Sequence, residues 1–223
     1  MNHFFKLSLT AVALVAATAA QAQSAGSVMV RVGATQISPS VTSGNLTTPS
    51  FPGTQADVDA NTQLGGGVTY MVTDHWAVDL PLALPFKHDI HGAGAIAGAG
   101  KIGEVKAWPV SLFAQYRFGE ASAKFRPYVG AGPTYARFFK ERSTNTLTAL
   151  TGGTPANPTT LSIESKLVPT VQLGATVALN DRWFVDAMVA KTWLKTRTTL
   201  STGQTLDIRL NPTTVAIAVG YRY

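Results

Sequence analysis

Residues 76–86 read WAVDLPLALPF, and their alternate side chains form an unbroken apolar row with an aromatic residue at each end. The row consists of Trp76, Val78, Leu80, Leu82, Leu84 and Phe86. Side chains that alternate in this way share one face of a β-strand. About ten steps of 3.3 Å, on a strand tilted by about 40°, climb roughly 25 Å, which is the height of the lipid-facing band in outer-membrane barrels. The stretch therefore predicts a strand that crosses an outer membrane.

The same spacing of aromatic side chains returns three times along the chain. It separates Trp108 from Phe118, Phe125 from Tyr135, and Trp183 from Trp193, each time on the apolar face of an alternating segment. Outer-membrane barrels carry an aromatic girdle at each membrane interface, so the spacing matches the distance between the two girdles. A soluble eight-stranded barrel of the lipocalin kind is the alternative, but it has no reason to repeat this spacing.

Alternating segments occur eight times, and helical spacing is found nowhere after the first residues. The segments lie near 26–38, 58–73, 75–89, 101–118, 124–140, 160–179, 182–198 and 205–223. Short joints alternate with long ones at 39–57, 90–100 and 141–159, which are rich in Gly, Pro, Thr and Asn. Tight periplasmic turns and longer outer loops alternate in the same way in outer-membrane barrels. The predicted fold is an all-β, eight-stranded, antiparallel, up-and-down transmembrane β-barrel.

The two ends of the chain indicate export and barrel closure. One cation, Lys6, precedes the apolar stretch LSLTAVALVAATAA, and Ala20-Gln21-Ala22 has the small-residue pattern of a cleavage site. Residues 1–22 therefore predict a cleaved signal peptide, and residues 23–223 a single outer-membrane barrel domain. The last residues, VAIAVGYRY, alternate as a closing strand that ends in Tyr223. A terminal aromatic residue resembles the signal read by the outer-membrane barrel assembly machinery, so this machinery is an expected partner.

The composition excludes several other classes of protein. The chain has no cysteine, so disulfides, thiolate nucleophiles and thiolate metal sites are ruled out. Charged residues make up 13% of the chain, against roughly 25% in an average soluble domain, which favours a surface that partly faces something other than water. The formal net charge of +6 comes from scattered Lys and Arg residues, and this scatter, together with export, argues against nucleic acid as a partner.

Four stretches of the sequence resemble the OmpW family of outer-membrane proteins. They are AGSVMVRVGAT (25–35), NTQLGGGVTYMVTDHWAVDLPLALPFKHDI (61–90), FRPYVGAGPTYARFF (125–139) and LDIRLNP through GYRY (206–223), and PFKH and RPYVGAG are the most specific motifs. The resemblance implies a narrow eight-stranded barrel in the outer membrane of a Gram-negative bacterium, linked to the passage of small hydrophobic compounds. Alkane-import proteins belong to the same family. Where relatives carry bulky apolar groups that pinch the lumen, this chain has Pro81 and Ala190, so the resemblance does not extend to a tight gate there.

Acids and bases gather near the periplasmic end of the rows that face the predicted interior. They are Arg31, Asp79, Arg117, Arg126 and Asp186. Buried charges must be paired, so we expect the two acids to pair with some of the three arginines. The cluster closes the floor of the lumen, either as a purely structural network or as a binding site for a polar solute.

Above this floor, the predicted lumen is lined by residues with little polarity. They are Pro81, Ala83, Pro109, Phe113, Met188 and Ala190. Eight strands leave an interior only just wide enough for its own side chains, which argues against a general porin. An apolar mouth above a closed floor favours a conduit that admits a small hydrophobic solute and releases it sideways through the wall. Pro127, Pro133 and Pro169 each remove a ladder donor, and they indicate either a weak wall or ordinary bulges.

Basic residues crowd the outer ends of the predicted strands and form a rim. They include Lys140, Arg142, Lys191, Lys195 and Arg197. The phosphate groups of lipopolysaccharide are the expected partners of this rim, although solvated charge alone is the alternative. Lys191 lies on the lipid face beside Trp193, where a long cation can extend to the membrane surface.

The sequence offers little support for an enzyme or a metal site. His88, Asp89, His91 and nearby serines show no nucleophile–base arrangement, and two histidines in a loop lack further ligands. We expect no catalytic residue, no cofactor and no metal. A surface receptor for phages or bacteriocins, or a structural protein without a transport role, remains the alternative. Loops 39–57 and 141–159 would carry such contacts, and Phe51 is their one aromatic residue.

Overall fold

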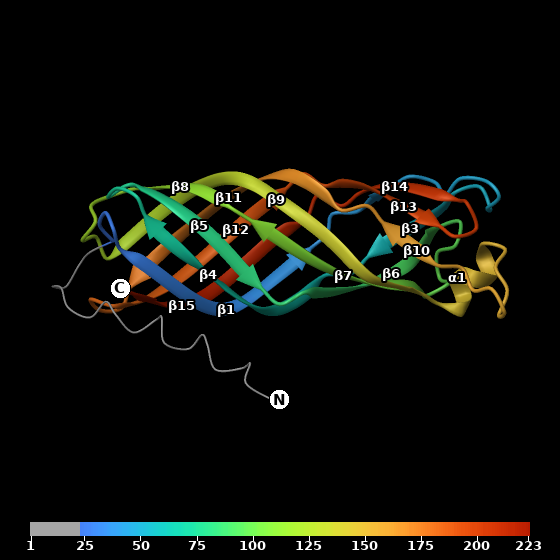
Figure 1. Cartoon of the computed structure of the whole chain (residues 1–223), viewed down its shortest axis with the longest axis horizontal. Helices are drawn as coiled ribbons and strands as arrows, with labels where there is room; N and C mark the ends of the chain where they lie inside the picture. Colours follow the sequence, from blue (N-terminus) through green and yellow to red (C-terminus); the bar gives the residue numbers. More distant parts are fainter. Residues whose placement is uncertain (1–22) are drawn as a thin grey trace, which may run out of the picture.

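The computed structural model describes residues 23–223, and the predicted signal peptide, residues 1–22, lies outside the described residues. Eight staves, each made of one or two strands, follow the eight alternating segments predicted from the sequence (Figure 1). In chain order they are β1 Val28–Ser38 with β2 Thr42–Ser43; β3 Thr54–Val58 with β4 Asn61–Met71; β5 Trp76–Ala83 with β6 Phe86–Gly94; β7 Lys101–Ser111 with β8 Phe113–Arg117; β9 Phe125–Ser143; β10 Leu161–Ile163 with β11 Lys166–Ala178; β12 Trp183–Thr192 with β13 Lys195–Leu200; and β14 Thr205–Arg209 with β15 Thr213–Arg222. Only the fifth stave runs without an interruption.

One strand from each stave forms a closed antiparallel barrel, which confirms the predicted fold class. These strands are β1, β4, β5, β8, β9, β11, β12 and β15. The last strand pairs with the first from Met29↔Arg222 to Ser38↔Thr213, as predicted. β11 pairs with both β9 and β12, which completes the ring. Closure removes the free strand edges that an open sheet would expose to lipid. Among residues 23–223, no helix is long and apolar enough to cross a membrane.

The outward face of the barrel is apolar, because alternate residues of each strand point away from the interior. Ile217 is 60% exposed and Leu82 is 49% exposed, although both are large and apolar. Three aromatic pairs at ten-residue spacing lie on this face, as predicted: Trp108 with Phe118, Phe125 with Tyr135, and Trp183 with Trp193. Two girdles result: an upper one of Trp108, Tyr135 and Trp193, and a lower one of Trp76, Phe118, Phe125, Trp183 and Tyr223.

The prediction that Phe86 ends the lipid-facing row is wrong, because Phe86 is fully buried and faces the interior. The cause is a slip in register between the third and fourth staves. β5 pairs Asp79 with Phe113, whereas β6 pairs Phe86 with Ala107, so one extra residue is accommodated between them. A slip of one residue moves every following side chain to the other face of the strand. Leu84 is therefore the last lipid-facing residue of the row.

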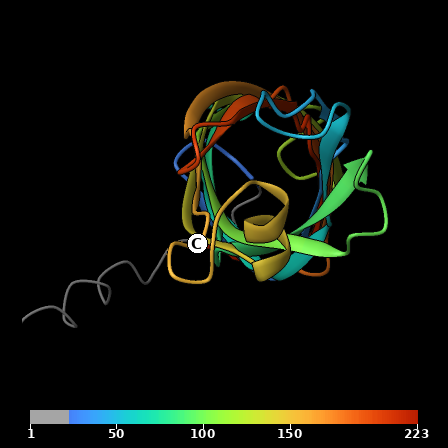
Figure 2. The ribbon, with the colours of Figure 1, turned by 90° about the vertical axis from the view of Figure 1, so that its right-hand side faces the viewer.

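The staves continue past the upper girdle as two separate walls, which the sequence did not predict. One wall consists of the outer part of β9 with β7, β6 and β3, and the other of β10, β13, β14 and β2. Parts of the predicted long loops are therefore strands, and the loop at 141–159 contains the helix α1, Asn145–Leu150. Figure 2 looks along the barrel from this end, with α1 lying across part of the mouth. The walls enclose a second interior region above the membrane.

The assignment of the two faces of β15 makes a direct prediction. Ile217 faces lipid midway along the strand, whereas its neighbour Ala216 borders an interior chamber. We expect Ile217→Arg to lower the free energy of unfolding by about 2–4 kcal/mol, the cost of an arginine at the bilayer midplane of such barrels. Ala216→Arg places the same charge toward the interior and should cost clearly less. Urea titrations in lipid vesicles measure both values, and equal losses would contradict the assigned faces.

Candidate functional site

A buried ion pair occupies the periplasmic end of the barrel interior. Arg31 Nη1 and Nη2 donate to the two carboxylate oxygens of Asp79 at 2.8 and 3.0 Å, and the Asp79 side chain is fully buried. Arg31 Nε lies 3.6 Å from Asp186 Oδ1. Tyr128 and Thr176 each donate a hydroxyl proton to Asp186 at 3.1 Å. One arginine from β1 is thus shared by two acids from β5 and β12, which is favourable only because hydrogen bonds also satisfy the remaining oxygens.

The other two arginines of the predicted floor bind neutral groups instead of acids. Arg117 Nη1 donates to Gln23 Oε1 at 2.8 Å and to Thr176 Oγ1 at 2.9 Å, and its guanidinium lies 4.7 Å from the centre of the Tyr128 ring. Arg126 donates to the main-chain oxygens of Gln23 and Asp74 at 2.7 and 2.6 Å. The five predicted residues are all buried at one end of the barrel, but only Arg31 pairs with the acids.

Gln23 is a floor residue that no pattern in the sequence indicates. Its side chain is almost fully buried, and both Arg117 and Arg126 donate to it. Its own main-chain N–H donates to Ala121 O at 3.0 Å, in the turn between β8 and β9. The segment that precedes β1 therefore folds under the barrel and adds a neutral acceptor to a floor that holds more bases than acids.

Directly above the floor lies a lower chamber of about 70 Å³. All six residues predicted to line the apolar lumen border it: Pro81, Ala83, Pro109, Phe113, Met188 and Ala190. Arg31 and Asp186 form its lower boundary. Gly33 and Gly65 on β1 and β4 also line it, and glycine is needed at both positions because a Cβ would collide with the Ile217 main-chain oxygen or the Thr35 hydroxyl.

A belt of hydroxyl groups lines one side of the interior at the top of this chamber. Ser111, Thr134, Thr170 and Thr192 form a chain of three hydrogen bonds of 2.7, 2.7 and 2.8 Å across β7, β9, β11 and β12. Thr134 and Thr192 border both the lower chamber and a cavity above it. The two spaces therefore adjoin at the belt, and together they form one path along the barrel axis.

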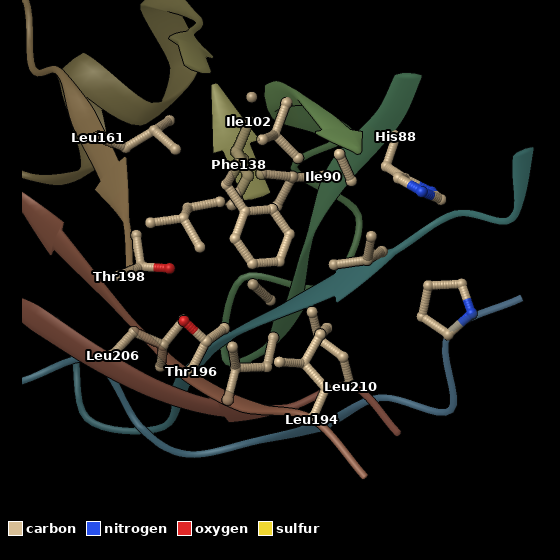
Figure 3. A pocket seen from close by; sticks show the side chains of 18 of the residues that line it. His88, Ile90, Ile102, Phe138, Leu161, Leu194, Thr196, Thr198, Leu206 and Leu210 are labelled. Carbon is tan, nitrogen blue, oxygen red and sulfur yellow. The ribbon is translucent and has the colours of Figure 1, made fainter. Parts of the chain in front are cut away.

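The upper cavity, of about 140 Å³, lies between the two walls of the extension (Figure 3). Its lining is almost entirely apolar, and includes Ile90, Ile102, Phe138, Leu161, Leu194 and Leu206. Leu147 and Leu150 of α1 cover its outer end. Gln204 joins the loops above it, because its Nε2 donates to Pro49 O at 2.7 Å and to Thr151 O at 3.2 Å. The path thus begins in an apolar space outside the membrane.

The barrel wall is interrupted beside the lower chamber. Among residues 23–223, pairing between the third and fourth staves stops at Asp79↔Phe113 and resumes at Phe86↔Ala107. Pro81, Pro85 and Pro109 lie in this gap, and proline has no N–H to donate to a ladder. Both edges of the gap, Pro81 to Ala83 on β5 and Pro109 on β7, border the lower chamber. Trp108 Nε1 spans the gap by donating to Ala83 O at 3.1 Å.

The wall between β9 and β11 is continuous. The prolines at 127, 133 and 169 were expected to weaken this ladder or to form bulges in it. Twelve consecutive residues of β11 pair with β9 from Lys166↔Ala136 to Val177↔Phe125, without a change of register. Pro133 and Pro169 lie directly opposite each other on the outer face. At this pair of positions neither residue would donate its N–H to the facing strand, so the ladder tolerates both prolines. The prolines therefore do not weaken the wall between β9 and β11.

The residues of the predicted basic rim are divided between the two walls. Lys140 and Arg142 lie on β9, Lys195 and Arg197 on β13, and Lys191 at the end of β12. Arg197 is paired with Asp207 through two hydrogen bonds of 2.7 and 3.0 Å. Lys191 Nζ extends toward Asn211 O and Thr213 Oγ1 at the upper end of β15. Lys140, Arg142 and Lys195 are exposed beyond the upper girdle, Lys191 lies just below Trp193 of that girdle, and the charge of Arg197 is balanced by an acid.

Comparison with known proteins identifies relatives over almost the whole described chain. The model of the OmpW family matches residues 24–223. Outer membrane protein W of Vibrio cholerae is 36% identical over 203 residues, which cover 89% of each chain. The dibenzothiophene metabolism operon protein PahQ of Pseudomonas aeruginosa is 27% identical over 77% of this chain and 76% of its own. The crystal structure of outer membrane protein OprG from Pseudomonas aeruginosa superposes with a TM-score of 0.81 at 28% identity, covering 91% of this chain and 98% of that one.

Proposed function

Because the chain belongs to the OmpW family of outer-membrane proteins of Gram-negative bacteria, we propose that it takes small hydrophobic molecules past the polar surface of the membrane and releases them sideways into it. The observation that carries this proposal is the unpaired stretch of wall between β5 and β7, which borders the lower chamber. An opening at this position leads from an apolar interior to the lipid region just below the upper girdle. A hydrophobic molecule that takes this route never has to enter water after it leaves the upper cavity.

The upper part of the path supports the same direction of travel. An apolar cavity that projects above the membrane can bind a hydrophobic molecule before it meets the charged surface of the outer leaflet. The hydroxyl belt below it is internally hydrogen-bonded, so an apolar molecule that passes does not leave strongly solvated groups without partners. The proposed route runs from the upper cavity, across the belt, to the lower chamber and out through the gap.

The floor supports release to the side instead of passage into the periplasm. Arg31, Asp79, Asp186 and Arg117 form one hydrogen-bonded network through Thr176, and Arg126 and Gln23 fill the space beneath it. Opening such a network would leave buried charges without partners, which costs several kcal/mol, roughly 3–5 for one broken pair. We propose that the floor stays closed while the gap in the wall opens.

The name of one relative agrees with an apolar cargo. PahQ is named for an operon of dibenzothiophene metabolism, and dibenzothiophene is an aromatic compound without charge. We further propose that lipopolysaccharide phosphates contact the outward-facing lysines and arginines of the rim, and that the strand ending in Tyr223 is recognised by the barrel assembly machinery. No enzymatic role is proposed.

Uptake by cells tests the proposal. Cells with and without the protein are given n-alkanes of graded length, and the rate of appearance in the cell is followed with isotope-labelled compounds. We expect the protein to raise alkane uptake and to leave the uptake of a sugar of similar size unchanged, because the path offers too few free polar groups to replace the water that a sugar would lose. Equal alkane uptake in both strains would contradict the transport role and would favour a receptor or a structural protein.

A further inference from the structure

His88 is the polar side chain that stands out in the upper cavity. It lies on β6 beyond the level of the upper girdle, two residues after Phe86, and its ring is nearly buried. The rings of Phe86 and His88 are stacked with their centres 6.3 Å apart. Phe86 borders the lower chamber, whereas His88 borders the upper cavity (Figure 3). His88 therefore stands beside the junction between the two spaces of the path.

The hydrogen bonding of His88 defines which ring nitrogen is left to accept a hydrogen bond. His88 Nδ1 lies 2.7 Å from Asp59 O. A carbonyl oxygen can only accept, so Nδ1 carries the proton and Nε2 has a free lone pair. Within residues 23–223, Nε2 takes part in no hydrogen bond. Burial lowers the pKa of His88 below its usual value, against the smaller opposing effects of the Asp59 carbonyl and of the Asp59 and Asp89 charges, so the ring stays neutral.

Three other hydroxyl groups around the cavity are already satisfied by the protein. The hydroxyl groups of Thr54, Thr151 and Thr196 donate to the main-chain oxygens of Phe51, Leu147 and Glu164 at 2.8, 2.7 and 2.6 Å. Aliphatic side chains and the Phe138 ring make up most of the remaining surface. A guest molecule would thus meet a mostly apolar enclosure. Among residues 23–223, the unused polar groups of its lining include His88 Nε2 and the hydroxyls of Thr198 and Thr214.

We propose that the upper cavity binds neutral hydrophobic molecules that carry one hydroxyl group, aliphatic alcohols or phenols, with the hydroxyl donating to His88 Nε2. The cavity of about 140 Å³ is similar in size to an engineered apolar cavity of roughly 150 Å³ that admits benzene. This inference rests on the proposed function only for the route by which the molecule arrives and leaves. It adds a chemical preference: the protein selects among hydrophobic molecules by their hydrogen-bond donor.

Other chemical classes fit this cavity less well. A pure hydrocarbon fills the apolar space but leaves Nε2 without a partner, and a buried acceptor without a partner is costly. A carboxylate has no proton to donate, and its charge would lose its hydration in an apolar enclosure. An alcohol avoids both costs, because its chain covers the apolar wall and its hydroxyl can donate to Nε2.

The first experiment uses the purified protein in lipid nanodiscs with ¹⁵N-labelled histidine. It compares 1-octanol with heptyl methyl ether, which has the same number of heavy atoms and no hydroxyl proton. One hydrogen bond contributes about 0.5–1.5 kcal/mol, so octanol should bind roughly two- to tenfold more tightly than the ether. Octanol should also shift the Nε2 resonance of His88, and the ether should not. Equal affinities and an unmoved Nε2 resonance would overturn the proposal.

The second experiment uses His88→Phe, which keeps an aromatic ring beside Phe86 and removes the acceptor. We expect the ratio of octanol to ether affinity to fall to about one, through a loss of octanol binding. A preference for octanol that survives in this variant would overturn the role of Nε2. If the variant does not fold, the response of the His88 Nε2 resonance to octanol in the parent protein still tests the proposal.

These outcomes separate the present inference from the transport role. A parent protein that prefers octanol in nanodiscs but does not raise alkane uptake in cells would refute only the transport role. A parent protein that raises alkane uptake but binds octanol and ether equally would refute only the preference for a hydroxyl group.

Discussion

Replacing Asp79 with alanine is expected to lower the free energy of unfolding of the barrel in lipid vesicles by about 3–5 kcal/mol. The Asp79 carboxylate is fully buried and receives both terminal nitrogens of Arg31. Its removal leaves a guanidinium in the barrel interior whose remaining acid, Asp186, lies 3.6 Å from Nε. The loss is large because a charge is left buried without its main partner, whatever the net contribution of the intact pair. Urea titration of folded protein in vesicles measures it.

The chain contains a matched control for this experiment. Asp207 binds Arg197 through two hydrogen bonds of 2.7 and 3.0 Å, almost the same geometry as in the floor, but its side chain is 48% exposed. When Asp207 is replaced with alanine, water can solvate the guanidinium that remains, so we expect little change in stability. Similar losses for the two variants would mean that burial does not decide the energetics of the floor, and the account of the floor as a closed network would fail.

The sequence predicted those features that follow from alternation alone. Aromatic residues ten positions apart defined the two girdles, and the inward-facing rows placed all six apolar lumen residues and all five floor residues at their observed levels. Their positions follow from the sequence because a strand fixes which face each residue occupies, and the membrane fixes the height of the apolar band; their roles as solute path and closed floor stay predictions. Where the strand stayed regular, position in the sequence was sufficient to predict which face of the strand a residue occupies.

Predictions failed where a strand changes register or where distant segments meet. Phe86 was placed on the lipid side because nothing in LALPF shows that one extra residue is accommodated beside Pro85. The two acids were expected to pair with some of the three arginines, and Arg31 does lie beside both, but the contact of Gln23 with Arg117 and Arg126 was not predicted. The meeting of residues about a hundred positions apart depends on barrel closure and leaves no local pattern in the sequence.

The upper cavity and the gap in the wall show two different limits of prediction from the sequence. Leu206, Ile208 and Leu210 alternate beyond the upper girdle and face inward, a signal that could have indicated an apolar space above the membrane. The gap has no such signal, because six prolines lie in strands or beside them on the third to sixth staves: Pro81, Pro85, Pro109, Pro127, Pro133 and Pro169. A proline interrupts a ladder only if its missing N–H faces the neighbouring strand, and that orientation depends on register.

Cross-linking the gap tests the central claim, release through the wall between β5 and β7. Continuing the register of Asp79↔Phe113 places Leu82 opposite Val110, both on the lipid face. The chain has no cysteine, so Leu82→Cys with Val110→Cys gives one defined pair of thiols. A disulfide forms if the Cα atoms lie within about 7 Å, and a short bifunctional thiol reagent serves if they lie farther apart. The control is Val129→Cys with Leu173→Cys, which joins Cα partners of the continuous wall between β9 and β11.

The decisive measurement is alkane uptake by cells that carry each pair of cysteines, before and after reduction, with cross-linking verified by mass spectrometry. The account predicts that closing the gap lowers uptake to that of cells without the protein, that reduction restores it, and that the cross-link in the continuous wall has no effect. Unchanged uptake with the gap fully cross-linked would show that the molecules leave by another route, and release between β5 and β7 would have to be abandoned.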